Sequence, residues 1–233
     1  VDMAISDINR TIIQIVNEVE RKLGVNSTTS VPSTTRLGTV LVDFLNDVMD
    51  EVADHGDWPA LQKSVVVTAV ASTTAYEVNV SAPVKTIHEI HFSADISPLR
   101  WVTPSEIRRL NRSRSYGRPR HYSVTEVSGV NPIFRVSPIP GSAQSGSPFE
   151  VSYFEKPILY EPTTAYSSIR PIFPSRVLVQ GTYAKALLDE SGGQETPAYR
   201  MAYGEYQKML REAFNRFTSD FGDEIQFVPT GPR

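Results

Sequence analysis

The run His88-Glu89-Ile90-His91 contains the residue types that most resemble a metal site in this chain. Zinc hydrolases carry two histidines four residues apart, a spacing that sets both imidazoles on one face of a helix. Here the spacing is three, and residues 84–92 favour a strand, in which positions 88 and 91 point to opposite faces. We therefore predict strand histidines and no metal site.

Other sequence patterns that support catalysis or hold a cofactor are not found. The sequence has no Gly-x-Ser-x-Gly nucleophile elbow, no Walker loop for phosphate and no Rossmann glycine fingerprint. One predicted helix has an acidic side, which is typical of a solvated helix face and consists of Asp43, Asp47, Asp50, Glu51 and Asp54. We therefore predict that the protein is not an enzyme, has no catalytic residues and binds no cofactor.

Arginines are concentrated between residues 100 and 120, where seven of them stand against one acid, Glu106. The local charge of +6 leaves −9 for the remainder of a chain whose net charge is −3. This asymmetry predicts a basic surface on an otherwise acidic molecule, suited to phosphate or to an acidic protein face. The candidates for contact with a neighbouring subunit or with DNA are Arg108, Arg109, Arg112, Arg118 and Arg120.

The tetrapeptide Gly117-Arg118-Pro119-Arg120 is similar to the core of an AT-hook, which places arginine in the DNA minor groove. The basic residues expected before such a core are missing, since Ser115 and Tyr116 precede it. We favour a turn that leads into a strand. A DNA-binding module that uses Arg100–Arg120 remains an alternative.

Apolar residues follow helical spacing at both ends of the chain and strand-like alternation between them. The pattern predicts four amphipathic helices, at residues 6–23, 36–54, 174–188 and 196–217. Between them, residues 63–70 and 76–80 are predicted to pair as a hairpin. Thr103 and Pro104 are predicted to start a short helix that ends near Asn111.

This order predicts an α+β fold, in which the N- and C-terminal helix pairs form an antiparallel bundle around an inserted antiparallel β-rich subdomain. The predicted domains are a discontinuous helical bundle (1–57 and 173–220), the β-rich insertion (58–172) and an extended C-terminal arm (221–233). Trp58 lies at the first junction, where its large side chain is a candidate structural anchor for the insertion.

Composition limits the class of protein further. The chain has 233 residues, 40% of them hydrophobic, which is enough for a sizeable core. It has no cysteine, which excludes disulfides and thiolate metal sites and suits synthesis in a reducing cytoplasm. Its start resembles no signal peptide, and its longest apolar runs are far too short to span a bilayer, so no membrane partner is expected.

The order of these segments resembles the head-to-tail adaptor proteins of tailed bacteriophages, particularly the tail tubular protein A type of short-tailed phages. The resemblance covers about residues 5–220 and rests on two helix pairs that flank the stretches DHGDWPALQKSVVVTAVASTTAYEVN, SPLRWVTPSEIRRL, YGRPRHYSV, FRVSPIPGS and FEVSYFEKP. Its most specific parts are Asp57-Trp58-Pro59 before the first strand and the Gly117–Arg120 turn before a later one.

The resemblance implies a structural virion protein at the head–tail junction, made in the host bacterial cytoplasm. It implies a dodecameric ring of identical subunits beneath the portal protein, which extends the DNA channel and is the platform for the next tail component, a nozzle or tail tube. Viral DNA would pass during ejection without sequence-specific binding. The C-terminal segment of such adaptors reaches the portal, which assigns portal docking to Phe221, Ile225, Phe227 and Val228. A tail-associated enzyme with an unrecognised site is the other alternative.

Overall fold

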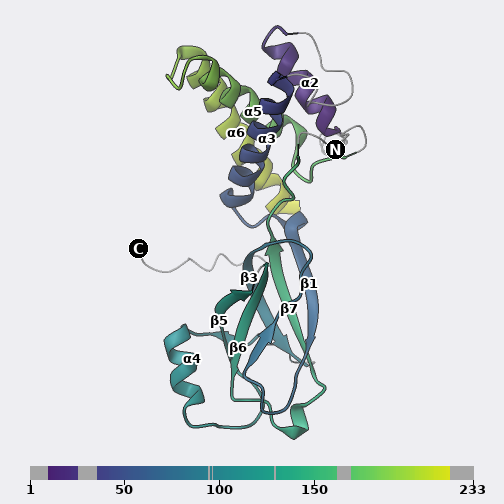
Figure 1. Cartoon of the computed structure of the whole chain (residues 1–233), viewed down its shortest axis with the longest axis vertical. Coiled ribbons are helices and arrows are strands. Elements are labelled where there is room, and N and C mark those ends of the chain that lie inside the picture. Colours follow the sequence, from purple (N-terminus) through teal and green to yellow (C-terminus); the bar gives the residue numbers. More distant parts are fainter. Residues whose placement is uncertain are drawn as a thin grey trace. The chain divides into compact units, whose positions relative to one another are not determined.

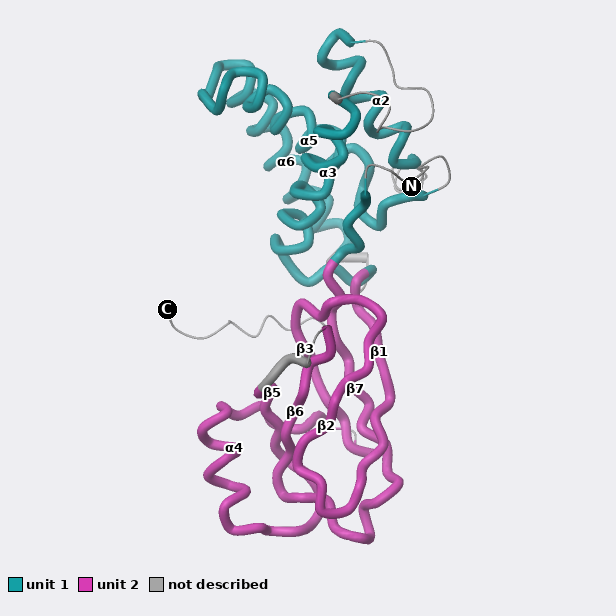
Figure 2. The backbone as a smooth tube through the Cα atoms, in the orientation of Figure 1, with its two compact units in different colours: residues 1–60, 157–233 teal, residues 61–156 magenta. Residues whose placement is uncertain are grey.

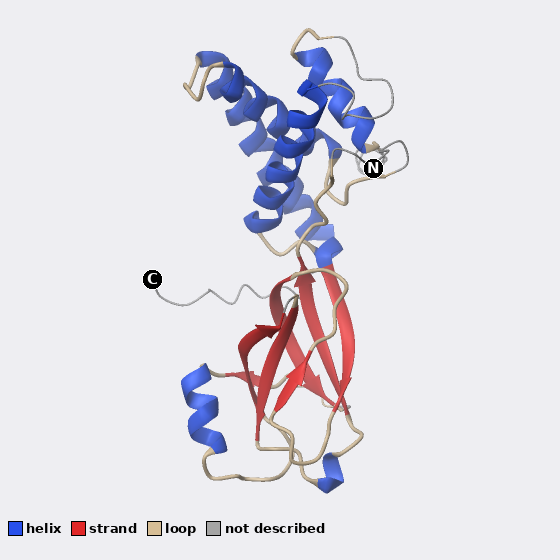
Figure 3. Cartoon of the chain, in the orientation of Figure 1, coloured by secondary structure: helices blue, strands red, loops and turns tan. Residues whose placement is uncertain are grey.

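The computed structural model describes residues 10–25, 36–93, 95, 97–128, 130–161 and 169–220, without the side chains of residues 36, 126–128 and 218–220. The chain divides into two compact units, coloured separately in Figure 2. Unit 1 comprises residues 1–60 and 157–233 and is built from helices, whereas unit 2 comprises residues 61–156 and contains the strands (Figures 1 and 3). The fold is therefore of the α+β class.

The helices of unit 1 are α2 (Ile12–Lys22), α3 (Arg36–His55), α5 (Ser175–Glu190) and α6 (Pro197–Asp220). Helix α5 contacts the other three helices, and most of its residues between Ser175 and Ala186 are buried. A helix that is apolar or small on most sides takes the central position, because every face of it can be covered. Unit 1 is therefore organised around α5.

The first described helix begins later than the predicted range of 6–23. Arg10 and Thr11 are not helical, and Thr11 has the extended backbone of an N-cap (φ −75°, ψ 161°). The backbone N–H of Thr11 donates to the side chain of Gln14 at 2.9 Å, which closes the first turn of α2. Residues 1–9, which include the first four positions of the predicted range, lie outside the described part of the chain.

The connector after the last strand groups with the helices, whereas the predicted boundary at 172/173 assigned it to the β-rich part. Asn46 of α3 explains this difference, because its side chain forms two hydrogen bonds with the backbone of Tyr160. The Asn46 amide donates to the Tyr160 carbonyl at 2.8 Å, and the Tyr160 N–H donates to the Asn46 carbonyl oxygen at 2.9 Å. Hydrogen bonds between one side chain and a loop backbone leave no periodic pattern in the sequence, so periodicity could not indicate this boundary.

Unit 2 contains two sheets. One has the order β1-β7-β3 and is antiparallel, and consists of β1 (Gln62–Thr68), β7 (Pro148–Glu155) and β3 (Val84–Phe92). The other has the order β2-β6-β5-β4, and consists of β2 (Ala75–Glu77), β6 (Asn131–Ser137), β5 (His121–Ser128) and β4 (Arg100–Trp101). The predicted antiparallel pairing holds for the other strand pairs, but β4 and β5 pair in parallel, so this sheet is mixed. The helix between them, α4 (Pro104–Asn111), supplies the crossover that a parallel pair requires.

The predicted hairpin of residues 63–70 and 76–80 was also wrong, because β1 and β2 lie in different sheets. Ser72 of the intervening turn has φ +63°, and the hydroxyl of Tyr76 donates to the carbonyl of Val70 at 3.1 Å. Both strands direct apolar side chains into the same core from opposite sheets. Alternation identifies such strands, but it does not identify their partners.

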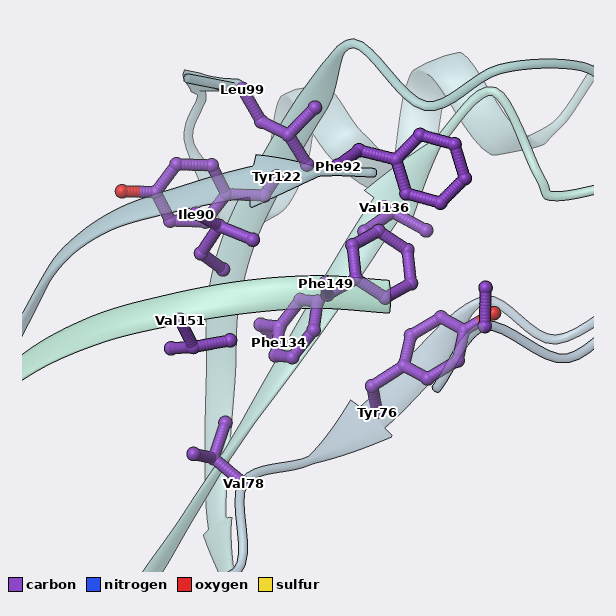
Figure 4. Packing of buried hydrophobic residues seen from close by; sticks show 11 residues of the cluster. Tyr76, Val78, Ile90, Phe92, Leu99, Tyr122, Phe134, Val136, Phe149 and Val151 are labelled. Carbon is purple, nitrogen blue, oxygen red and sulfur yellow. The ribbon is translucent and has the colours of Figure 1, made fainter. Parts of the chain in front are cut away.

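The core of unit 2 lies between the two sheets (Figure 4). Phe149 of β7 is at its centre, with ring centroids 4.9 Å from Tyr76, 4.9 Å from Phe92 and 5.5 Å from Phe134. Phe149 and Phe134 are fully buried. Aromatic rings in tilted and edge-on contact therefore join the sheets.

Candidate interaction surfaces

Helix α4 is held on unit 2 by one side and exposes the other. Its first turn is as predicted: Thr103 is the N-cap, and its hydroxyl accepts the N–H of Glu106 at 3.3 Å. Ile107 is fully buried, and α4 contacts β5 and β6. At the end of the helix the Asn111 amide donates to the carbonyl of Val136 at 3.0 Å.

Two predicted contact residues on the exposed side of α4 have partners within their own helix. The Arg108 Nε donates to the carbonyl of Pro104 at 3.0 Å. The Arg109 guanidinium lies 3.7 Å from the Glu106 carboxylate, an exposed pair of small energetic value. Both side chains remain exposed, but their local partners compete with any external one.

Arg118 has a structural role in the tetrapeptide that resembles an AT-hook. Its guanidinium forms a bidentate ion pair with Asp95, with Nε 2.9 Å from Oδ2, and lies 5.9 Å from the centroid of the Phe92 ring. The N–H of Gly117 donates to the carbonyl of Ile139 at 2.8 Å, and Arg120 then leads directly into β5. The segment is the favoured bend before a strand, and Arg118 fastens it to the end of β3.

The remaining arginines of this segment are exposed and have no side-chain partner among the described residues: Arg100, Arg112, Arg114 and Arg120. Two exposed aromatic side chains accompany them, since Trp101 and Tyr116 are each 57% exposed. We call these six residues the basic–aromatic surface, which runs around the edge strand β4, because Arg100 and Trp101 point to opposite faces of the sheet. Sequence reasoning missed its aromatic members, because charge patterning identifies only the arginines.

Hydrogen bonds to backbone carbonyl groups hold the segments that carry these residues near the end of β6. The side-chain amide of Asn111, next to Arg112, donates to the carbonyl of Val136. The N–H of Arg120 donates to the carbonyl of Ser137 at 2.9 Å. Tyr116 forms a bridge with Ile139. The N–H of Arg100 donates to the carbonyl of Arg120 at 2.8 Å, which brings β4 and Trp101 to the same place.

Unit 1 has an acidic groove between α3 and α6. Its volume is about 390 Å³, and it is lined by Asp50, Glu51, Asp54, His55, Tyr203, Tyr206, Gln207 and Leu210. Asp50, Glu51 and Asp54 are exposed. Lys185 of α5 pairs with Glu51 at 2.6 Å and lies 3.7 Å from Asp47, on the acidic side of α3.

Tyr206 forms the buried wall of the groove. It is 1% exposed, and its hydroxyl donates to the Glu51 carboxylate at 3.4 Å. Burial raises the pKa of Tyr206 well above its usual value, and the nearby Glu51 carboxylate raises it further. The phenol therefore remains a neutral hydrogen-bond donor to Glu51 at neutral pH.

Trp58 lies in unit 1 and is 1% exposed. Its indole N–H donates to the carbonyl of Val52 at 2.6 Å. Its ring lies edge-on to Phe173, Phe214 and Phe217, with centroid distances of 5.4, 5.3 and 5.6 Å. The tryptophan thus joins the end of α3, the connector and α6, directly before the 3-10 turn η2 (Pro59–Leu61) that leads to β1. Its role as the anchor of the insertion stays a prediction.

The family model described as SU10 adaptor protein matches residues 10–230. The chain belongs to this adaptor family. The resemblance to bacteriophage head-to-tail adaptors is thereby confirmed. No curated protein matches the chain.

Membership of the adaptor family implies a structural virion component that interacts with portal and tail components, rather than an enzyme. The histidines of β3 have local contacts: His91 Nε2 lies 3.4 Å from Glu89, and the His88 ring is edge-on to Phe154. Within the described ranges, no group of three His, Asp or Glu side chains is arranged to hold a metal ion.

Phe221, Ile225, Phe227 and Val228, the predicted portal-docking residues, lie outside the described residues of the adaptor. The α-helices that are described are too short or too polar to cross a membrane. Among the described residues, the candidate interaction sites are the basic–aromatic surface and the acidic groove.

Proposed function

We propose that this adaptor forms a dodecameric ring beneath the portal, extends the DNA channel and provides the platform for the next tail component. The observation that carries the proposal is the family match over residues 10–230, which covers both compact units. A ring of one chain type requires two different surfaces on each subunit. The adaptor has two such surfaces of opposite charge.

The two compact units support separate structural roles for the helices and the strands of the adaptor. We propose that α2, α3, α5 and α6 form an antiparallel bundle from the two ends of the chain, with the β-sandwich as an inserted domain. The contacts of α5 with each of the other three helices support a bundle. The proposed C-terminal arm, residues 221–233, completes this organisation.

We assign portal docking to the C-terminal arm. Its apolar residues Ile225, Phe227 and Val228 are followed by Pro229, and such apolar side chains can fill pockets on a partner. Removal of the arm therefore separates portal attachment from the contacts between subunits.

The channel role is proposed from the charge of the chain. A net charge of −3, with an acidic majority outside residues 100–120, limits electrostatic binding of DNA phosphates to most of the surface. DNA would then slide through the ring without sequence-specific contacts. A specific DNA-binding module would instead need base contacts, for which the engaged Arg118 is poorly placed.

The test is sedimentation of the adaptor with the portal ring of the same phage. We expect co-migration at about one adaptor per portal subunit, and loss of co-migration when residues 221–233 are deleted. A matched control deletes only Gly231–Arg233, which leaves the apolar residues and should preserve binding. Circular dichroism checks that both shortened chains remain folded.

Portal binding by the chain without residues 221–233 would overturn the assignment to the arm. No co-migration of the full chain with an intact portal would overturn the adaptor ring itself. Tight duplex binding by the free chain, with a steep dependence on salt, would favour the DNA-binding alternative.

A further inference from the structure

We propose that the basic–aromatic surface of one subunit docks on the acidic groove of a second copy, so that unit 2 of each subunit contacts unit 1 of its neighbour. This inference rests on the proposed ring, and it names the residues that join the subunits. Both surfaces are exposed in the described chain, and each is made by a different unit.

The first argument is charge complementarity. Unit 2 has eleven Lys and Arg against seven Asp and Glu, a net charge of +4, whereas unit 1 has twelve against nineteen, a net charge of −7. Charges of opposite sign on two faces attract copies to each other, and contacts between like faces are repelled. The acidic unit 1 of a second copy therefore complements the charge of the basic–aromatic surface.

The second argument is the chemistry of the basic–aromatic surface, which favours protein over nucleic acid. All four unpartnered cations are arginine, and they accompany Trp101 and Tyr116, each 57% exposed. Arginine, tryptophan and tyrosine are enriched at the centres of protein interfaces and dominate their binding energy. Burying two large aromatic side chains requires a partner with apolar surface, which the phosphates and sugars on the outside of duplex DNA do not supply.

The third argument is that the acidic groove provides what these side chains need. Carboxylates of Asp50, Glu51 and Asp54 line it; Glu51 is shared with Lys185 and Tyr206, and the exposed Asp54 carboxylate can accept guanidinium hydrogen bonds in bidentate geometry. Tyr203, 40% exposed, and the buried Leu210 provide apolar lining beside the carboxylates. Arginine can stack on an aromatic face while it binds a carboxylate. The groove is therefore a better receptor for arginine and tryptophan than a polar helix face alone.

The two surfaces differ, so the contact can be heterologous, as a ring requires. When the basic–aromatic surface of one copy binds the acidic groove of the next, the same contact can repeat from copy to copy. The series closes into a ring when the rotation between neighbouring copies allows it. A two-fold dimer would make the same contact twice between two copies, so the ring proposed above is what selects the repeating arrangement. The proposed contact thus predicts a directional chain of subunits.

The absence of cysteine from the sequence permits a direct test by disulfide cross-linking. One preparation carries Arg112→Cys, the other carries Asp54→Cys, and the two are mixed and assembled on the portal ring before mild oxidation. We expect a covalent dimer that requires both variants. The matched control replaces Asp54→Cys by Asp189→Cys, an exposed acid on α5 outside the groove, and should give no dimer.

Charge reversal adds an independent test. Variant A carries Arg112→Glu and Arg114→Glu, and variant B carries Asp50→Arg and Asp54→Arg. Each alone should lose more than about tenfold in association between copies, because like charges then face each other. An equimolar mixture of A and B, or a chain with all four changes, should recover association, because opposite charges meet again.

The outcomes separate this proposal from the adaptor ring. Co-sedimentation with the portal but neither a cross-link nor rescue by the mixture would overturn the proposed contact and leave the ring intact. A cross-link and rescue in concentrated free adaptor, with no portal binding, would uphold the contact and overturn the portal role. Loss of duplex binding in variant A, not restored in the four-change chain, would identify DNA as the occupant of the basic–aromatic surface instead.

Discussion

The two units build their cores in opposite ways. The core of unit 2 comes from one continuous stretch, residues 61–156, whereas unit 1 joins residues 1–60 to residues 157–233. Trp58 shows the consequence, because its ring contacts Phe173 and Phe214, which are more than a hundred positions away in the sequence. Ordering such distant segments costs more chain entropy than ordering neighbouring strands. The helical unit therefore depends more on a few long-range contacts.

The packing of the two cores also differs. Large rings around Phe149 fill the space between the sheets of unit 2. In unit 1, glycine allows close approach: a Cβ at Gly181 of α5 would lie 2.6 Å from Val48 Cγ1 and 2.9 Å from Tyr206 Cε2. Unit 2 should thus be sensitive to lost volume, and unit 1 to both lost and added volume.

The largest expected effect comes from Trp58→Ala compared with Phe149→Ala. Each removes a fully buried aromatic side chain and should lower the free energy of unfolding of its own unit by about 3–5 kcal/mol. Hydrogen exchange measured by mass spectrometry reports the two units separately. We expect Trp58→Ala to speed exchange in α3 and α6, and Phe149→Ala to speed it in the strands.

A milder change at the same position refines the result for Trp58. Trp58→Phe keeps an aromatic ring but removes the N–H that donates to Val52, which leaves a buried carbonyl without this partner and should cost about 1–3 kcal/mol. Equal acceleration of exchange in both units by Trp58→Ala would contradict the comparison, because the two cores would then unfold as one.

Local patterns predicted the helices well because they depend on neighbours in the sequence. Helix α3 spans residues 36–55 against a prediction of 36–54, and α4 has the predicted Thr103 cap and ends at Asn111. Partners of strands depend on the whole fold, which is why the hairpin prediction failed at Ser72. The place of the connector was likewise not predicted, because the hydrogen bonds of Asn46 that hold it leave no periodic pattern in the sequence.

The second prediction compares two glycines of unit 1. Gly181→Ala should destabilise the helical unit by about 1–3 kcal/mol, because the new methyl group would overlap Val48 and Tyr206. Gly204 of α6 has no atom within 4 Å of an added Cβ, so Gly204→Ala should stabilise the helix by about 0.5–1 kcal/mol. Chemical denaturation with circular dichroism at 222 nm (a wavelength that reports helix) measures both. Stabilisation by Gly181→Ala would show that α5 can move away from its neighbours.

The candidate surfaces were only partly accessible from sequence. The arginine concentration was evident from composition, but its division into engaged Arg118 and unpartnered Arg112 depends on where Asp95 lies after folding. Likewise, the acidic side of α3 was evident, whereas the groove also needs Tyr203 and Leu210 from α6. Charge can be counted along a chain, but a receptor requires residues that the fold brings together.

The smallest expected effect concerns pH and the wall of the acidic groove. Burial raises the pKa of Tyr206 in the folded state, whereas in the unfolded chain it is about 10. The stability that the neutral phenol provides is therefore fully present below pH 10, and is lost as pH rises from 10 toward the folded-state pKa. Tyr206→Phe cannot ionise, so unit 1 should lose less stability between pH 9 and 11 than in the unmodified protein.

At neutral pH the same substitution should cost only about 0.5–1.5 kcal/mol, because the ring is kept and Glu51 retains its ion pair with Lys185. Unit 2 is the internal control: burial also raises the pKa of Tyr76 and of Tyr122, so its alkaline loss of stability should be unchanged in Tyr206→Phe. Hydrogen exchange corrected for the intrinsic effect of pH distinguishes the units. An equally steep alkaline loss in unit 1 of the variant would mean that another group, such as Tyr199, whose pKa is also raised by burial, controls its titration.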